Sequence, residues 1–142
     1  MAANSNPLFL LTPKMAWGTV TTANTAMDGT GTVVTIFTGG TNGSLVKEIR
    51  MVPLGSNTQS PVRIFINNGS TNATPANNSL FYDTTMATVT GSNTTALLPQ
   101  VLTPGNGLPM DGLFVPNGYK LNVTIGTTVA TGIAVAALGG DY

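Results

Sequence analysis

The chain contains no cysteine and no histidine among its 142 residues. The lack of cysteine excludes disulfide bonds, thiolate metal sites and cysteine nucleophiles. The lack of histidine removes the commonest general base and the commonest ligand of transition metals. We therefore expect no catalytic residues, no metal site and no cofactor, and we expect the protein not to be an enzyme.

Charged side chains are also scarce. They make up 7% of the chain, with five basic and five acidic residues and a formal net charge of zero, whereas a typical soluble domain has about 25%. A neutral chain lacks the basic surface that phosphate backbones require, so we expect no nucleic-acid partner. So little charge protects poorly against self-association, which favours a protein that works inside an assembly.

Long apolar runs and helical periodicity are missing as well. The apolar segments 8–11 and 131–138 are much shorter than a membrane span, and no basic residues precede the first. No window repeats apolar residues with the helical spacing, and threonine, valine, glycine and asparagine form helices poorly. We expect neither helices nor a membrane partner.

Strand-like segments are what the sequence does contain, and clusters of glycine, proline, asparagine and serine separate them. Eight such segments predict an all-β fold, an antiparallel β-sandwich of jelly-roll type. The domain prediction is an N-terminal arm over residues 1–14 and a single β-sandwich domain over 15–142. The expected strands cover residues 15–22, 32–38, 44–54, 61–67, 80–89, 108–115, 119–126 and 133–138.

Alternation within these segments predicts which side chains face the core. In segment 44–54 it places Leu45, Ile49 and Met51 on one face and Val46 on the other. The remaining inward residues are expected to be Val62, Ile64, Ile66, Leu121, Val123, Ile125, Ile133, Val135 and Ala137. The connections at 69–78 and 91–107 are long, which is typical of loops that cross between sheets or carry contacts.

Residues that could carry chemistry are isolated from one another. The five acids share no motif, and this pattern favours solvated surface charges and turn residues over a catalytic carboxylate pair. Asp28 precedes Gly29 as in a turn, although it could also contribute to a calcium site. The glycine-rich segments 29–31 and 39–43 do not precede a helix, so we interpret them as hairpin turns and not as phosphate loops. The group Lys47, Glu48 and Arg50, with Arg63, is interpreted as a solvated strand face or as cross-strand pairs.

Candidate interface residues lie near the N-terminus. Pro7 and Pro13 bracket four apolar residues, a pattern that suits an extended segment on another protein surface. Trp17 is the only tryptophan, and it could be an interface or core anchor or part of a sugar-binding platform. The candidate interface residues are Pro7, Leu8, Phe9, Leu10, Leu11 and Trp17.

Several segments together resemble the head decoration, or cement, proteins of tailed phages. They are residues 23–33 (Ala-Asn-Thr-Ala-Met-Asp-Gly-Thr-Gly-Thr-Val), 49–55 (Ile-Arg-Met-Val-Pro-Leu-Gly), 62–69 (Val-Arg-Ile-Phe-Ile-Asn-Asn-Gly), 116–121 (Pro-Asn-Gly-Tyr-Lys-Leu) and the Gly-Asp-Tyr end. The resemblance implies a virion structural protein on the capsid surface that binds the major capsid protein, bridges capsomers and forms a homotrimer. It brings no catalytic residues with it.

Three other functions share the same composition. A receptor- or carbohydrate-binding domain of a tail, fibre or spike is the main alternative to the cement protein. A small glycosidase or depolymerase module is a further alternative, and it would require two acids that converge in a cleft. A secreted bacterial β-domain is the last, and the missing secretion signal disfavours it.

Overall fold

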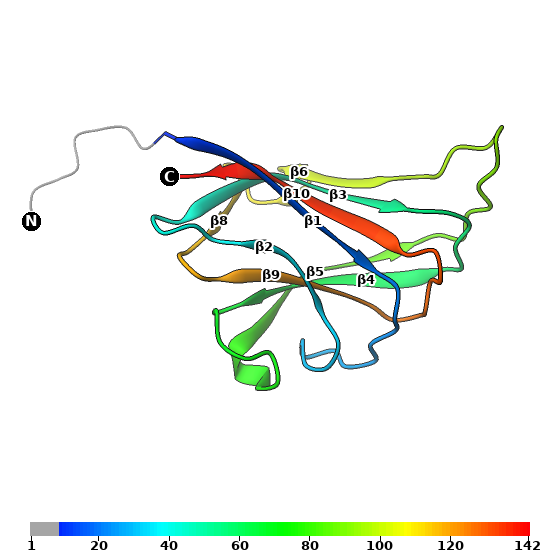
Figure 1. The fold of residues 1–142 in the computed structure, drawn as a ribbon, viewed down its shortest axis with the longest axis horizontal. Helices are drawn as coiled ribbons and strands as arrows, with labels where there is room; N and C mark the ends of the chain where they lie inside the picture. Colours follow the sequence, from blue (N-terminus) through cyan, green and yellow to red (C-terminus); the bar gives the residue numbers. More distant parts are fainter. Residues whose placement is uncertain (1–8) are drawn as a thin grey trace, which may run out of the picture.

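The computed structural model describes residues 9–142 and shows two packed β-sheets (Figure 1). No helix in this described range is long and apolar enough to cross a membrane. The one helical element is η1, a single turn of 3₁₀ helix over Pro75–Asn77. The strands are β1 (Thr12–Val20), β2 (Val34–Thr38), β3 (Ser44–Pro53), β4 (Ser60–Asn67), β5 (Asn78–Met86), β6 (Gln100–Pro104), β7 (Gly107–Leu108), β8 (Leu113–Val115), β9 (Lys120–Ile125) and β10 (Ile133–Asp141).

The strand order is that of a jelly roll. The first sheet runs β1-β10-β3-β6-β7, with β8 also paired to β3, and the second runs β2-β9-β4-β5. Apart from the short strands β7 and β8, eight strands form two four-stranded sheets, and every connection between consecutive strands of these eight passes from one sheet to the other except that from β4 to β5. This is the double-sheet arrangement of jelly rolls. The predicted jelly-roll sandwich is confirmed, antiparallel except for the β6–β7 pair, with β6 and β7 added to the expected eight strands.

The core lies between the two sheets, and the predicted alternation holds in β4, β9 and β10. Ile64, Val123 and Val135 are fully buried, and Ile66 is partly buried against the same cluster. Burying one such side chain completely stabilises the fold by about 1.5–3 kcal/mol. The inward faces of these three strands therefore account for much of the packing that holds the sheets together.

A β-bulge interrupts strand β3 at Lys47. Leu138 of β10 pairs with Glu48, whereas the next residue, Gly139, pairs with Val46. Lys47 is thus an extra residue without a partner, and it shifts the alternation of β3 by one position.

This bulge makes one sequence prediction wrong. Leu45 was expected to share a face with Ile49 and Met51, and Val46 was expected on the opposite face. Val46 is instead fully buried in the core with Ile49 and Met51, while Leu45 is only half-buried. Strict period-2 counting fails here because a bulge cannot be read from a single strand's pattern.

Strand β6 was not expected, because residues 91–107 were predicted to be a loop. Its residues 100–102 pair with residues 49–51 of β3. Leu102 is its one buried residue, so the segment has no alternating pattern that would reveal a strand. The connection 87–99 does cross between the sheets, as expected of a long loop. The connection 68–77 instead joins β4 to β5 within one sheet.

The glycine-rich turns also differ from expectation. Gly29 and Gly31 adopt positive φ angles of 80° and 78°, and Gly43 adopts one of 86°, which is backbone that favours glycine. However, segments 29–31 and 39–43 connect strands of different sheets, so they are corners of the sandwich and not hairpins.

Strand β1 begins earlier than predicted. Residues 12–14, which we assigned to the N-terminal arm, pair with residues 139–141 of β10. They therefore belong to the sandwich domain. The arm residues 1–8, which include the candidate interface residues Pro7 and Leu8, lie outside the described residues.

The loop between β1 and β2 covers part of the outer face of the second sheet. Phe65 points away from the core but is 1% exposed, and a Cβ at the buried Gly29 would lie 3.1 Å from its ring. The side chain of Asn24 donates hydrogen bonds to the carbonyls of Thr30 (2.8 Å) and Thr32 (2.7 Å), and Asn72 donates one to Gly31 (2.9 Å). Asparagine side chains thus hold this loop in place.

Candidate interaction surface on strand β1

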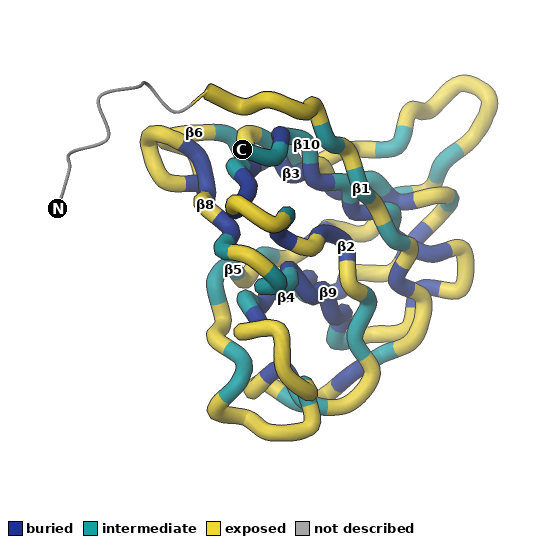
Figure 2. The backbone as a smooth tube through the Cα atoms, turned by 60° about the vertical axis from the view of Figure 1, so that its left-hand side comes forward, coloured by how far each residue is buried: buried dark blue, intermediate teal, exposed yellow. Residues whose placement is uncertain are grey.

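Strand β1 exposes a row of apolar side chains. Met15 and Trp17 are 60% and 66% exposed, and they point to the outer side of the strand. Leu11, just before β1, is 77% exposed. Phe9 precedes them and is also exposed. We call these four residues, Phe9, Leu11, Met15 and Trp17, the β1 ridge. Figure 2 shows the exposed N-terminal end of β1 and the alternation that follows it.

The neighbours of the ridge on the same face are small or only partly buried. Met15 lies opposite Leu138, and Trp17 lies opposite Ala136 of β10. Ala136 in turn lies opposite Arg50 of β3. Because directly opposed residues share a face of the sheet, the large Trp17 ring stands beside a methyl group, which is too small to cover it.

The ridge runs along the edge of the six-stranded sheet. Among the strands of residues 9–142, β1 pairs only with β10. That pairing covers nine residues, from Thr12 with Asp141 to Val20 with Ile133, without a register shift. The result is a long and regular edge strand that carries exposed apolar side chains.

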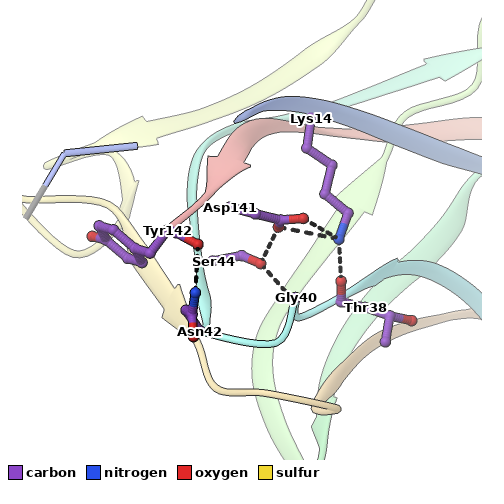
Figure 3. A network of polar contacts seen from close by, with 7 residues as sticks. All are labelled: Lys14, Thr38, Gly40, Asn42, Ser44, Asp141 and Tyr142. Carbon is purple, nitrogen blue, oxygen red and sulfur yellow. Dashed lines mark hydrogen bonds and ion pairs between the residues drawn. The ribbon is translucent and has the colours of Figure 1, made fainter. Parts of the chain in front are cut away.

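The inward side of β1 is fixed by Lys14 (Figure 3). Its Nζ donates a hydrogen bond to the carbonyl of Thr38 at 2.6 Å and lies 3.2 Å from Oδ1 of Asp141. The same ammonium group lies 4.7 Å from the centre of the Phe37 ring, within the range of a cation–π interaction. The one charge of β1 is therefore directed into the sandwich and neutralised there.

Asp141 connects this lysine to strand β3 and to the turn that precedes it. Its carboxylate accepts a hydrogen bond from the hydroxyl of the fully buried Ser44 at the start of β3. The Ser44 Oγ also accepts a hydrogen bond from the backbone N–H of Gly40 at 2.8 Å. The hydrogen bond from Ser44 and then the nearby Lys14 ammonium hold the pKa of Asp141 below its usual value, against the opposing effect of burial.

Two other acids, Asp28 and Glu48, make local contacts. Asp28 accepts hydrogen bonds from the backbone N–H and the hydroxyl of Thr30, and these bonds lower the pKa of Asp28. This is the Asx turn expected for this position. Glu48 pairs with Arg50 at 2.8 Å. Within residues 9–142, no group of three acidic side chains is close enough to hold a metal ion.

The charged group anticipated around Lys47 is divided between the sheets. Lys47 and Arg50 belong to β3, whereas Arg63 belongs to β4 of the other sheet. Arg63 lies opposite Asp83 of β5, with its Nε 3.5 Å from Oδ2. The interpretation as cross-strand pairs fits Arg63 and Asp83.

Of the candidate interface residues, four lie in the described range, and they are exposed: Phe9, Leu10, Leu11 and Trp17. Met15 belongs to the same ridge but was not among the candidates. The period-2 row formed by Leu11, Met15 and Trp17 was the signal that could have revealed it.

Comparisons of this chain with protein-family models, with curated proteins and with solved structures found no significant match. The class that the fold defines is therefore a jelly-roll β-sandwich with an apolar edge strand.

Proposed function

We propose that this protein is a structural component of a virus particle, which binds the outer surface of the capsid and stabilises it by bridging capsomers. The role is that of a cement protein, with the major capsid protein as its partner. Jelly rolls are frequent among viral capsid and lectin domains. Fold alone does not assign a function, so the proposal depends on the surface of this chain.

The observation that carries the proposal is the exposed apolar segment at the start of β1. Phe9 and Leu11 are 69% and 77% exposed, although exposure of an apolar side chain to water is unfavourable. Exposed apolar side chains that form a continuous patch mark surfaces for protein contacts. Aromatic residues at such sites commonly contribute most of the binding energy.

The low charge of the chain supports the same role. Charged residues are depleted at the centre of protein interfaces, because their desolvation is costly. This chain has ten charged residues in all, and three ion pairs engage Lys14 with Asp141, Arg50 with Glu48, and Arg63 with Asp83. Much of its surface can therefore contact another protein without leaving a charge buried and unpaired.

The proposal is tested by counting this chain in purified virions of its source by quantitative mass spectrometry. A ratio near one copy per major shell subunit is the expected result. A handful of copies per particle would assign the chain to the neck, tail or fibre. Its absence from particles would reject a virion role altogether.

Binding of the purified protein to particles that lack it tests whether the apolar segment at the start of β1 is the capsid contact. The variant F9S/L11S is expected to lose at least tenfold in affinity for such particles, because it removes two exposed anchors. The matched control is M27S/L98S, which changes two equally exposed apolar residues, each 62% exposed and outside β1. Equal affinity of the two variants would show that the start of β1 is not the capsid contact.

A second candidate function is carbohydrate binding in a tail or fibre, and Trp17 favours it. Its ring is exposed on an open sheet face, in the same row as Ala136 and Arg50, and an exposed aromatic ring can stack on a sugar. Because Trp17 is the only tryptophan, its fluorescence reports directly on this face. A saturable fluorescence change with a host glycan, together with calorimetric binding of that glycan that W17S abolishes, would support this function over the cement role.

A further inference from the structure

The edges of the two sheets differ in how they are protected against pairing with another chain. Natural proteins protect edge strands by making them short, by bulges or by charged side chains. In the described residues, β2 has five residues and a bulge between Thr35 and Phe37. Strands β7 and β8 have two and three residues. Strand β5 is longer, but it has a register shift and carries the exposed carboxylate of Asp83.

Strand β1 lacks these protections over residues 14–20, although proline, another protective residue, occurs at Pro13 near its N-terminal end. It has nine residues and a regular register with β10. Its one charged residue, Lys14, points inward and is neutralised by Asp141. Pro13 is the sole residue of the strand that cannot donate a backbone hydrogen bond, and it lies near the N-terminal end, so residues 14–20 remain free of any blocking feature.

We propose that two copies of this chain pair through their β1 edges, in antiparallel orientation about a two-fold axis. Identical strands that meet in this way form a closed, isologous contact. The two six-stranded sheets then become one continuous sheet across the dimer. The trimer implied by the family resemblance would need a different contact, because antiparallel pairing of one edge with itself closes at two copies.

The register proposed is the one that overlaps the whole strand, with Pro13 of each copy opposite Thr19 of the other at the two ends of the contact. Full overlap of Thr12–Val20 with its copy places the axis at Ala16, the middle residue of the nine. Met15 of each copy then lies opposite Trp17 of the other. Such a cross-strand pair would bring the thioether sulfur to the indole ring, which is a favourable contact of about 0.3–1.5 kcal/mol. The two pairs would also cover the most exposed apolar side chains of the strand.

The oligomeric state of the purified protein tests the dimer. Sedimentation should give about twice the 14.5 kDa of one chain. The variant M15E/W17E places glutamates opposite each other across the axis, and it is expected to raise the dissociation constant at least tenfold. The control M27E/L98E adds the same charge at two sites that are also exposed, and it should leave the dissociation constant within twofold of the wild type.

A single engineered thiol tests the register. The chain has no cysteine, so A16C introduces the only one. Opposed Cα atoms in an antiparallel pair are about 4.5–5.5 Å apart, which lies within the range of a disulfide. Mild oxidation should therefore convert most of A16C into a covalent dimer, whereas the exposed thiol of M27C should stay largely monomeric.

The possible outcomes separate this inference from the proposed function. A wild-type protein that stays monomeric at high concentration, a mass of three chains, or a dimer insensitive to M15E/W17E would each overturn β1 pairing. Failure of A16C to crosslink faster than M27C would do the same. All of these measurements use the purified protein alone, so they remain informative even if the protein proves not to bind a capsid.

Discussion

Lys14 and Asp141 stand 127 positions apart in the chain, yet Nζ of the lysine lies 3.2 Å from Oδ1 of the aspartate. Each side chain is 27% exposed, so this is a largely buried ion pair. It joins the first strand to the last, and through Ser44 and Thr38 it also reaches β3 and β2. One end of the sandwich is therefore closed by a connected set of polar contacts.

Replacing Asp141 with asparagine should weaken this end of the fold. The variant D141N keeps the size of the side chain but removes its charge, and we expect the free energy of unfolding to fall by about 1–3 kcal/mol. Urea denaturation at neutral pH measures the change. The exposed Asp111 makes no ion pair among the described residues, so D111N serves as the control and should change stability by less than about 0.5 kcal/mol. Equal effects of the two variants would contradict a stabilising role of the network.

The same carboxylate should make stability depend on pH. Its pKa in the folded protein lies below the usual value of 3.8, so the unfolded chain takes up the proton first as the pH falls. The stabilisation is therefore complete above the unfolded pKa and is lost as the pH falls through the folded pKa. The stability difference between the wild type and D141N should be constant from pH 7 to about pH 5 and should shrink below about pH 4. Asp28 also has a lowered pKa, but it is present in both proteins and cancels in the difference.

The bulge in β3 requires a glycine opposite it. A Cβ at Gly139 would collide with the carbonyl oxygen of Leu45, and backbone atoms cannot move aside as a flexible side chain can. We expect G139A to lower the free energy of unfolding by more than about 2 kcal/mol. Gly118 offers a contrast, because it has a φ of 73° but nothing within 4 Å of an added Cβ. G118A should cost only about 1 kcal/mol, the penalty of the left-handed backbone. A smaller effect of G139A than of G118A in denaturation would show that the bulge can rearrange.

Asn24 should hold the loop between β1 and β2 against the second sheet. It is 7% exposed, donates to the carbonyls of Thr30 and Thr32, and accepts from the N–H of Ala26. N24A would leave these backbone groups without their partner, and we expect a loss of about 2–3 kcal/mol. Hydrogen exchange should also become faster in residues 24–32. The exposed Asn93 serves as the control, and N93A should leave both quantities nearly unchanged.

Local pattern was sufficient for most of the fold. The alternation in Ile64, Val123 and Val135 and their neighbours predicts strands with one buried face, and these side chains do line the core. Alternation of apolar side chains predicts the buried face correctly here, because burial on one face is a property of each strand by itself. The long connections were expected either to cross between sheets or to carry contacts, and of the two only the one after β5 crosses.

Pairing between segments far apart in the chain accounts for the sequence predictions that were wrong. Strand β6 exists because β3 offers it a partner, although Leu102 is its only buried residue. The bulge at Lys47 arises where β3 meets β10, so the position of Val46 depends on a segment far away in the chain. No window of the sequence contains both partners of such a pair.

The candidate surface was predicted in part. The sequence alone indicated an apolar stretch near the N-terminus and singled out Trp17 as an interface candidate. Met15 was not among the candidates, although it alternates with Trp17 within the strand expected over residues 15–22. What the pairing with β10 adds is that this strand is an edge of its sheet.

The sequence by itself thus determined the fold class, the inward faces of the strands and the near absence of surface charge, since each follows from composition or from short-range periodicity. Only the tertiary structure decided which strand lies at an open edge and which way its single charge points. Edge position is set by pairing with residues more than a hundred positions away, and the direction of Lys14 is set by Asp141 at the other end of the chain. Those two facts leave β1 long, regular and without an exposed charge.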